Sequence, residues 1–439
     1  MGDGAISKTQ GPPPPATLAT AKDVLDSALR VGLAMSPRAL AEKALAEAQQ
    51  PPPTNLTQSP IANTVAKTLA PTPPTQGTNR PESFPFSAGA NGQLSPVGDF
   101  KRFLALPDPT EKTLASSRPM LFDYMHTGQF GEFAGDQGVA IRYIVFAPPP
   151  GVPIKGVINL VQGTRESMAK YAEFLFNLRD LRAQGYVIAT MDHRGQGFSG
   201  KEFPDRLHIE NRQQLIDDEI KFREILVQHF GAQVPYTAIG HSLGAAVAAR
   251  EVEQHPDHYR SLILLAPMLN MQTGHTDTVE KLAAVAFEAD HLLTHLQTDV
   301  LGQASAHERA PGETAYNPAL PFDGNGRTHS RARFAFAEQT YRDFPDTQID
   351  GITRQWFAEG VKLGREVQTQ QASNLSLAHT HILLAKEDSY VENHNTVQLA
   401  DRLELRRTYW PSKHELLHAP DDVRTHVMNY LRQVITGQL

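Results

Sequence analysis

The chain has 439 residues, a formal net charge of −7 and no cysteine. This mild acidity, with no run rich in Lys and Arg, argues against nucleic-acid binding, because contacts with phosphates need a basic surface. Without cysteine the chain can form no disulfide, no thiolate nucleophile and no Cys-ligated metal site.

The sequence also carries information about location. No apolar run approaches the ~18 residues needed to cross a bilayer. The N-terminus lacks the basic-then-apolar pattern of a secretory signal. We therefore expect a cytoplasmic or peripherally membrane-associated protein, with non-classical secretion as an alternative.

Residues 1–117 are expected to form a low-complexity, largely disordered N-terminal extension rich in Pro and Ala. The first hundred residues contain 15 of the 32 prolines, including PPPP at 12–15 and PPP at 51–53. Such a segment buries too little apolar surface to offset the entropy lost on ordering. The pattern becomes regular from residue 118, and residues 118–439 are expected to form one folded domain.

Within this domain, strand-like and helix-like segments alternate, and most of the strands are continuous apolar runs. This pattern is typical of an α/β fold, with a mostly parallel central sheet and helices on both faces. The helix at 211–231 is expected to bury Ile216, Ile220, Val227 and Phe230. Strands are expected at 139–148, 156–161, 186–192, 235–240, 261–267 and 381–388, and further helices at 167–185, at 245–255 and from 420 onward.

Residues 268–375 interrupt the alternation. The segment begins with a helical pattern, TVEKLAAVAFEADHLLTHL, and continues as the loop-rich APGETAYNPALPFDGNG. We interpret it as a helical insertion between two core strands, placed like a lid.

The segment AIGHSLGAA contains a GxSxG motif, Gly240 to Gly244, with Ser242 at its centre. An apolar strand leads into the motif and an Ala-rich helix follows it. This context predicts a sharp strand-to-helix turn that exposes the Ser hydroxyl as a nucleophile. Gly240 and Gly244 are expected there because side chains would clash across the turn.

A nucleophilic serine needs a base, and the base needs an acid to orient it. After a nucleophile of this kind, the acid and then the base follow in the chain. The acid should come just after a late strand, where HILLAKEDSYVEN offers Glu387, Asp388 and Glu392, and we favour Asp388. The base should lie in the loop before the final helix, where His414 has His418 and His426 as rivals.

The reaction also needs two N–H donors for the oxyanion. One is expected from Leu243, the residue after the nucleophile. The other should come from the loop after the first buried strand, where LVQGTRES places Gly163 and Thr164. Thr164 N–H is the candidate, and Gly163 would let the backbone approach the substrate closely.

The sequence HELLH at 414–418 matches the HExxH pattern of zinc proteases. Both histidines would then have to lie on one face of an unbroken helix, but Pro411 and Pro420 leave room for barely two turns. A third ligand is also required, and no Glu follows His418. We therefore expect no metal here.

Several stretches together resemble the α/β-hydrolase superfamily, in particular its bacterial lysophospholipase and monoacylglycerol lipase branch. The resemblance covers residues from about 118 to 439. It implies Ser242 as nucleophile, Asp388 as orienting acid and His414 as base, and it indicates a structural role for Asp192 to Gly197. Where many relatives have His before the oxyanion glycine, this chain has Gln162. The stretches are EFAGDQGVAIRYIVFAP, QGTRESMAKYAE, MDHRGQGFSG, GHSLGAA, THSRARF and KHELL.

This resemblance implies a serine hydrolase that cleaves fatty-acyl esters, most simply a lysophospholipase or monoacylglycerol lipase, without a metal or cofactor. Its partners would be a lipid-like ester and a peripheral membrane surface, and no nucleic acid. One alternative is a serine aminopeptidase or general carboxylesterase on the same fold, although QGTRES lacks the HGGPG-like loop of many such aminopeptidases. Further alternatives are a non-catalytic binding protein and an effector protein on this scaffold.

Overall fold

The structure is a computed structural model that describes residue 84 and residues 100–271, 306–310, 313–369 and 372–439. The described residues all lie in one compact unit, residues 77–439. Most of the predicted N-terminal extension, and residues 272–305 of the predicted insertion, lie outside the described residues. The predicted boundary at 117/118 falls inside helix α4 (Leu114–Met125), whose Leu114 and Leu121 are fully buried.

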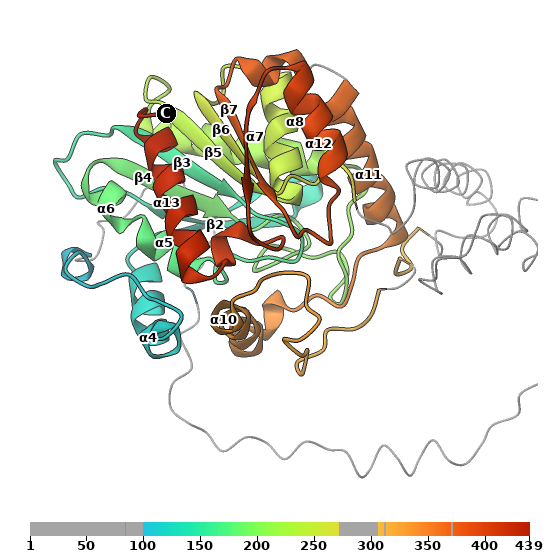
Figure 1. Ribbon diagram of the computed structural model, residues 1–439, viewed down its shortest axis with the longest axis horizontal. Coiled ribbons are helices and arrows are strands. Elements are labelled where there is room, and N and C mark those ends of the chain that lie inside the picture. Colours follow the sequence, from blue (N-terminus) through green and yellow to red (C-terminus); the bar gives the residue numbers. More distant parts are fainter. Residues whose placement is uncertain (1–83, 85–99, 272–305, 311–312, 370–371) are drawn as a thin grey trace, which may run out of the picture. The chain divides into compact units, whose positions relative to one another are not determined.

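An eight-stranded sheet forms the centre of the molecule (Figure 1), in the order β1-β2-β4-β3-β5-β6-β7-β8. Strands β1 and β2 pair antiparallel, as do β2 and β4, and every other neighbouring pair is parallel. The predicted mostly parallel sheet is therefore confirmed. The strands are β1 (Gln129–Ala134), β2 (Ala140–Phe146), β3 (Gly156–Val161), β4 (Tyr186–Met191), β5 (Tyr236–His241), β6 (Ser261–Leu265), β7 (Thr380–Ala385) and β8 (Arg406–Trp410).

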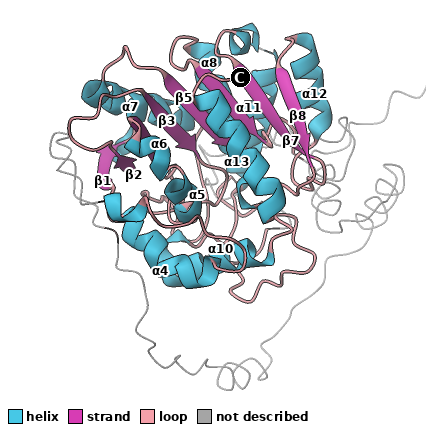
Figure 2. Cartoon of the chain, turned by 60° about the vertical axis from the view of Figure 1, so that its left-hand side comes forward, coloured by secondary structure: helices cyan, strands magenta, loops and turns pink. Residues whose placement is uncertain are grey.

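The central strands are apolar on both faces because helices cover both sides of the sheet. Every residue of β3, β5, β6 and β7 is buried. One helix layer contains α7, α8, α11 and α12, and the other contains α5, α6 and α13 (Figure 2). The bounds are α5 (Ala172–Asn177), α6 (Arg179–Ala183), α7 (Gln213–Phe230), α8 (Leu243–Gln254), α10 (Arg331–Asp343), α11 (Arg354–Thr369), α12 (Asn393–Arg402) and α13 (Asp421–Ile435).

The helix predicted at 167–185 begins later and is divided. Helix α5 starts only at Ala172, and α6 follows after one residue, Leu178. The N–H of Met168 donates to the carboxylate of Asp192 at 2.7 Å instead of to a carbonyl in its own turn. Residues 167–171 therefore form turns that hold the chain against a distant loop.

The predicted inward face of α7 is only partly correct. Ile216 is fully buried, but Ile220, Val227 and Phe230 are only partly buried. The fully buried part of the face includes a carboxylate, Glu219, whose Oε2 accepts a hydrogen bond from Asn159 Nδ2 at 3.0 Å. A pattern of apolar residues alone cannot predict a buried helix face that includes Glu219. The other apolar residues on the buried face of α7 are Leu215, Phe222 and Leu226.

Within the predicted insertion, helix α11 belongs to the helix layer of the sheet. It packs against α8 and α12 and connects β6 to β7 as a crossover helix (Figure 1). Helix α10 instead lies next to α4, where Arg118 donates to Asp343 at 2.6 Å. Among the described helices, none combines the length and apolar character needed to cross a membrane.

Candidate active site

Ser242 lies at the turn between β5 and α8 and has an unusual backbone conformation. Its φ of 52° and ψ of −116° are strained for a residue with a Cβ. Two backbone hydrogen bonds fix the turn: Ser242 N–H donates to Leu265 O, and Met268 N–H donates to Ser242 O, both at 3.0 Å. This geometry matches the strand-to-helix turn predicted from the GxSxG motif.

The two glycines of the motif are required by close backbone contacts. A Cβ on Gly240 would lie 2.5 Å from Ala245 Cα, and one on Gly244 would lie 2.1 Å from Val161 O. The second contact brings the N-terminus of α8 directly against the end of β3. The backbone of Leu243 is therefore close to the loop that follows β3.

Asp388 and His414 are brought together from loops after two neighbouring strands. Asp388 follows β7 and His414 follows β8, so both lie beyond the carboxyl edge of the sheet. The Nδ1 of His414 lies 2.7 Å from Oδ2 of Asp388. An N–H donated from Nδ1 to the carboxylate leaves Nε2 available as a base.

The surroundings of Asp388 favour its anionic form. Burial opposes ionisation, but the contact with His414 and the N–H groups of Tyr390 and Val391, at 2.9 and 3.0 Å, outweigh it and lower the pKa of Asp388. The other two acids considered have different partners. Glu387 contacts His329, and Glu392 accepts a hydrogen bond from Asn270.

Ser242 and His414 are linked through His241. The Nε2 of His241 lies 3.3 Å from His414 O, and the two imidazole rings lie 4.9 Å apart between centroids. The residue before the predicted nucleophile thus contacts the predicted base. Within the described residues, the Ser242 hydroxyl has no hydrogen-bond partner, and the side chain is 7% exposed.

Within the described residues, the N–H groups of the two predicted oxyanion donors have no acceptor. Leu243 is the first residue of α8, so its N–H has no intrahelical acceptor. Among the hydrogen bonds of the described chain, none uses the N–H of Thr164. Gly163 is held beside them, because its N–H donates to Glu166 Oε2 at 2.5 Å.

Beneath these groups lies a buried ionic network that the sequence analysis did not identify. Lys170 Nζ donates to Glu166 at 2.6 Å and to Glu415 at 2.8 Å. Burial opposes ionisation of both carboxylates, but Lys170 lowers the pKa of Glu415 to about 2 and, with His241, holds that of Glu166 well below its ordinary value. The network therefore connects the predicted oxyanion loop, through Gly163, to the residue that follows His414.

The Glu166–Lys170 pair has i,i+4 spacing, a signal that was present in the sequence. The partner Glu415 is 245 residues away and could not be inferred from spacing. Glu415 Oε1 accepts a hydrogen bond from Lys170 and so belongs to this network. His418 is buried, and its Nδ1 lies 3.5 Å from Glu415. His426 is exposed on α13 and bonds to Asp422 O, so neither rival histidine contacts Asp388.

The loop after β4 contacts the predicted oxyanion loop, and a structural role is expected for its residues Asp192 to Gly197. The carboxylate of Asp192 accepts bonds from Gln162 Nε2, Met168 N and Phe198 N. Gln196 donates to Gly163 O at 2.7 Å. Gln162 is therefore an anchor for this loop.

Comparison with known proteins identifies the family of the chain. The family model described as "Serine aminopeptidase, S33" matches residues 152–421. The chain belongs to this family of α/β-hydrolases. The predicted fold and the predicted resemblance to the lysophospholipase and monoacylglycerol lipase branch are confirmed.

Two relatives and one solved structure illustrate the similarity. Lysophospholipase L2 of Escherichia coli (strain K12) is 27% identical over 279 residues, which cover 62% of this chain and 74% of that protein. Monoacylglycerol lipase of Mycolicibacterium smegmatis is 27% identical over 197 residues, covering 44% of this chain and 65% of that protein. A soluble variant of monoglyceride lipase from Saccharomyces cerevisiae has the same fold, with a TM-score of 0.50, 17% identity, and 70% and 93% coverage of the two chains.

Proposed function

We propose that this protein hydrolyses single-chain fatty-acyl esters, as a lysophospholipase or monoacylglycerol lipase, through an acyl-enzyme formed on Ser242. The family and its named relatives support a carboxylic ester hydrolase. The observation that carries the assignment of residues is the 2.7 Å contact between His414 and Asp388, beyond the same edge of the sheet as the strained Ser242.

In the proposed reaction, His414 Nε2 takes the proton of Ser242 while Oγ attacks the ester carbonyl. Asp388 keeps the proton of His414 on Nδ1 and stabilises the imidazolium. The N–H groups of Leu243 and Thr164 bind the tetrahedral oxyanion. The alcohol leaves with the proton from His414, and water then releases the fatty acid by the same steps.

The proposed substrate is a lipid-like ester, and a peripheral membrane contact is proposed as its source. Two relatives are named for lysophospholipase and monoacylglycerol lipase activity, and both names imply an ester with one acyl chain. The large side chain of Tyr390 lies beside the predicted base, with its ring 5.2 Å from that of His414, and is 47% exposed. This ring is suited to contact the substrate next to the base.

Labelling and turnover of one variant test the proposal. Ser242→Ala should abolish labelling by a fluorophosphonate probe and reduce hydrolysis of p-nitrophenyl butyrate by about 10³-fold or more. Ser116→Ala, on an exposed position of α4, should retain both. Undiminished labelling of the Ser242 variant would assign the nucleophile elsewhere, and an unlabelled, inactive wild-type protein would favour a non-catalytic binding protein.

A serine aminopeptidase is the second candidate, because the matching family carries that description. Such an enzyme needs an acidic site for the substrate amine, whereas Glu166 and Glu415 are already bound to Lys170. A panel of lysophosphatidylcholine, monoacylglycerol and aminoacyl-naphthylamides on purified protein separates the two. We expect turnover of the lipid esters, and preferential cleavage of the naphthylamides would replace the lipase assignment.

A further inference from the structure

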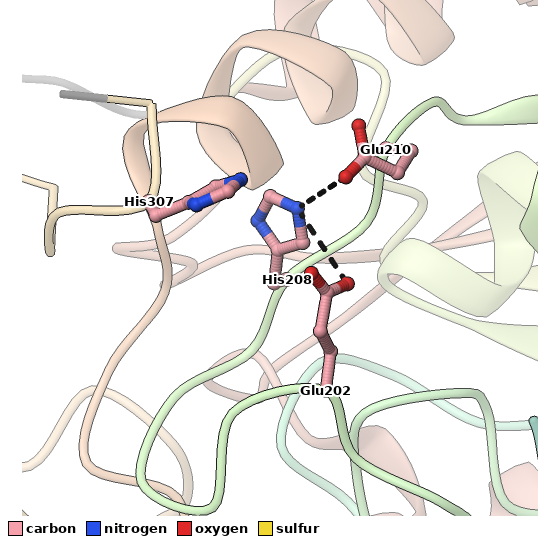
Figure 3. A group of neighbouring side chains, drawn as sticks. All are labelled: Glu202, His208, Glu210 and His307. Carbon is pink, nitrogen blue, oxygen red and sulfur yellow. Dashed lines mark hydrogen bonds and ion pairs between the residues drawn. The ribbon is translucent and has the colours of Figure 1, made fainter. Parts of the chain in front are cut away.

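Four side chains converge at a second site, apart from the residues assigned to ester hydrolysis. Glu202, His208 and Glu210 come from the loop between β4 and α7, and His307 comes from the segment 306–310 (Figure 3). One ligand atom from each residue can be chosen so that all four lie within 4.8 Å of one another. Among the described residues this is the one group of three or more His, Asp or Glu side chains with such geometry, and it contains neither histidine of the HExxH sequence.

The central histidine is already oriented for a ligand. The side chain of His208 is fully buried, and its Nδ1 lies 3.0 Å from Thr353 Oγ1. The other ring nitrogen, Nε2, faces the carboxylates of Glu210 and Glu202 at 3.4 and 3.8 Å. A histidine that binds a metal usually has its second nitrogen held in this way by an oxygen atom.

Within the described part of the chain, neither of the two carboxylates, Glu202 and Glu210, forms an ion pair with Lys or Arg, and both face His208. The nearby Arg309 pairs instead with Asp205 and Asp350, at 3.0 and 3.2 Å. The contacts with His208 are longer than the usual 2.7–3.2 Å of a hydrogen bond. Two negative charges beside a buried imidazole are therefore left for a cation to neutralise.

Backbone hydrogen bonds hold the segments that carry these residues. Leu207, next to His208, accepts a bond from Thr353 N at 2.9 Å and donates to Gly351 O at 2.8 Å. Ala310 N donates to Ile352 O at 2.8 Å, and Arg206 donates to the carbonyl of His307 at 3.2 Å. The frame of the site thus exists before any ion binds.

We propose that Glu202, His208, Glu210 and His307 bind one divalent transition-metal ion, with zinc as the best match. Two imidazole nitrogens and two carboxylate oxygens suit zinc and its neighbours, whereas Mg²⁺ and Ca²⁺ prefer sites made entirely of oxygen. Tetrahedral zinc, with bonds of about 2.0–2.2 Å, needs ligand atoms roughly 3.4 Å apart. The side chains of Glu202 and Glu210, 47% and 43% exposed, have the freedom to close that difference.

Bound there, the ion joins the segment 306–310 to the loop after β4. His307 is six residues before Glu313, whose carboxylate pairs with Arg165 in the oxyanion loop. The role of the ion is therefore structural, since none of its four ligands belongs to the groups proposed for ester cleavage. The inference is independent of the proposed function.

Metal binding to the purified full-length protein tests the site directly. After chelator treatment and dialysis, titration with Zn²⁺ followed by calorimetry should show one tight site per chain. Saturating Zn²⁺ should raise Tm by roughly 2–5 °C. Co²⁺ should give the visible absorption of a four-coordinate complex. These readouts do not depend on catalysis.

A double variant that removes one ligand from each of the two segments tests which residues bind the ion. The double variant His307→Gln with Glu202→Gln should lose at least about 100-fold in Zn²⁺ affinity together with the shift in Tm. His394→Gln, at an exposed position of α12, should bind as the wild type does. Circular dichroism verifies that both variants are folded. Unchanged affinity in the double variant, no tight site in the wild type, or tighter binding of Mg²⁺ or Ca²⁺ than Zn²⁺ would each overturn the proposal.

Discussion

His414 and Glu415 are adjacent in the chain but serve different parts of the site. The ring of His414 lies against Asp388, while the carboxylate of Glu415 lies against Lys170. The backbone N–H of Glu415 also donates to Arg327 O at 2.9 Å. The loop that carries the predicted base is thus fixed on both sides, which leaves His414 little freedom to move away from Asp388.

Single substitutions of the two histidines of HELLH distinguish the proposed base, His414, from the buried packing residue, His418. His414→Gln should lower kcat by about 10³-fold or more, because it removes the proton acceptor that Asp388 orients. His418→Gln should keep kcat within about tenfold and lower Tm, because His418 is buried and its ring lies 5.4 Å from that of Tyr171. Steady-state kinetics on p-nitrophenyl butyrate and thermal melts measure both effects.

The Asp388→Asn variant is the matched test of the acid. It preserves the shape of the side chain but leaves His414 without a negative partner, so kcat should fall by about 10³–10⁴-fold. Glu387→Gln, one residue earlier, should have little effect because the side chain of Glu387 is exposed and forms its ion pair with His329, away from His414. A larger loss in the Glu387 variant would reassign the acid.

At the scale of elements, the sequence predicted strands more accurately than helix limits. Continuous apolar runs such as GVINLV at 156–161 and SLILL at 261–265 indicate buried strands regardless of their neighbours. The late start of α5 depends on Asp192, which takes the N–H of Met168 from another part of the chain. The role of α11 depends on its packing against α8, which no local pattern encodes.

Contacts between distant parts of the chain also limit how much of the site the sequence predicts. The placement of Ser242, Asp388 and His414 beyond one edge of the sheet could be predicted, because each follows the end of a parallel strand and such ends share one edge. The network of Glu166, Lys170 and Glu415 could not, because it joins residues 245 positions apart. Likewise, His208 and His307 meet only because the chain returns to the loop after β4 through the insertion.

Two glycines in α11 test whether this helix is part of the core. A Cβ on Gly364 would lie 2.5 Å from Leu269 O, whereas one on Gly360 would meet its nearest atoms only at 3.5 Å. Gly364→Ala should therefore destabilise the fold by about 1–3 kcal/mol. Gly360→Ala should stabilise it by about 0.5–1 kcal/mol, because alanine favours the helix. Urea denaturation of both variants gives the comparison, and equal stabilities would mean that α11 does not pack on the segment after β6.

At the scale of the whole molecule, buried titratable groups make the stability of the fold depend on pH. Burial and Lys170 lower the pKa of His418 to about 4, and Lys170, against the effect of burial, lowers that of Glu415 to about 2. For His418, the unfolded chain takes up a proton near pH 6.5 that the folded chain refuses until about pH 4, so stability falls as pH drops through this range. For Glu415, stability present above about pH 4.5 is lost as pH falls towards 2.

As pH falls from 7.5 to 4, each proton that only the unfolded chain binds lowers the free energy of unfolding by about 1.4 kcal/mol per pH unit. His193, whose pKa burial lowers to about 4, adds to the same window. Asp192 and Glu253, whose pKa values burial raises to about 7, act in the opposite direction, so thermal melts of the wild type and of His418→Gln over this range measure the contribution of His418 as a difference. His418→Gln should reduce the change in stability per pH unit by the amount that one such proton contributes. A slope identical to that of the wild type would exclude His418 as a source of the acid sensitivity.

Phe84 shows that the folded unit extends well before the regular part of the sequence. Its side chain is 7% exposed, and its ring lies 4.8 Å from that of Phe130, 5.2 Å from Phe344 and 5.3 Å from Phe198. These rings come from β1, from the residue after α10 and from the loop after β4. A single phenylalanine therefore connects three parts of the catalytic domain.

Removal of this ring should destabilise the domain by about 3–5 kcal/mol, as expected for a large buried aromatic side chain. Phe84→Ala should therefore lower Tm markedly, whereas Leu106→Ala, at a position 38% exposed, should not. Deletion of residues 1–76 retains Phe84 and should leave Tm near that of the full chain, while deletion of residues 1–99 should reproduce the loss seen in Phe84→Ala. If both deletions melt like the full chain, the aromatic cluster does not need residue 84, and the ordered unit begins later than the ring contacts indicate.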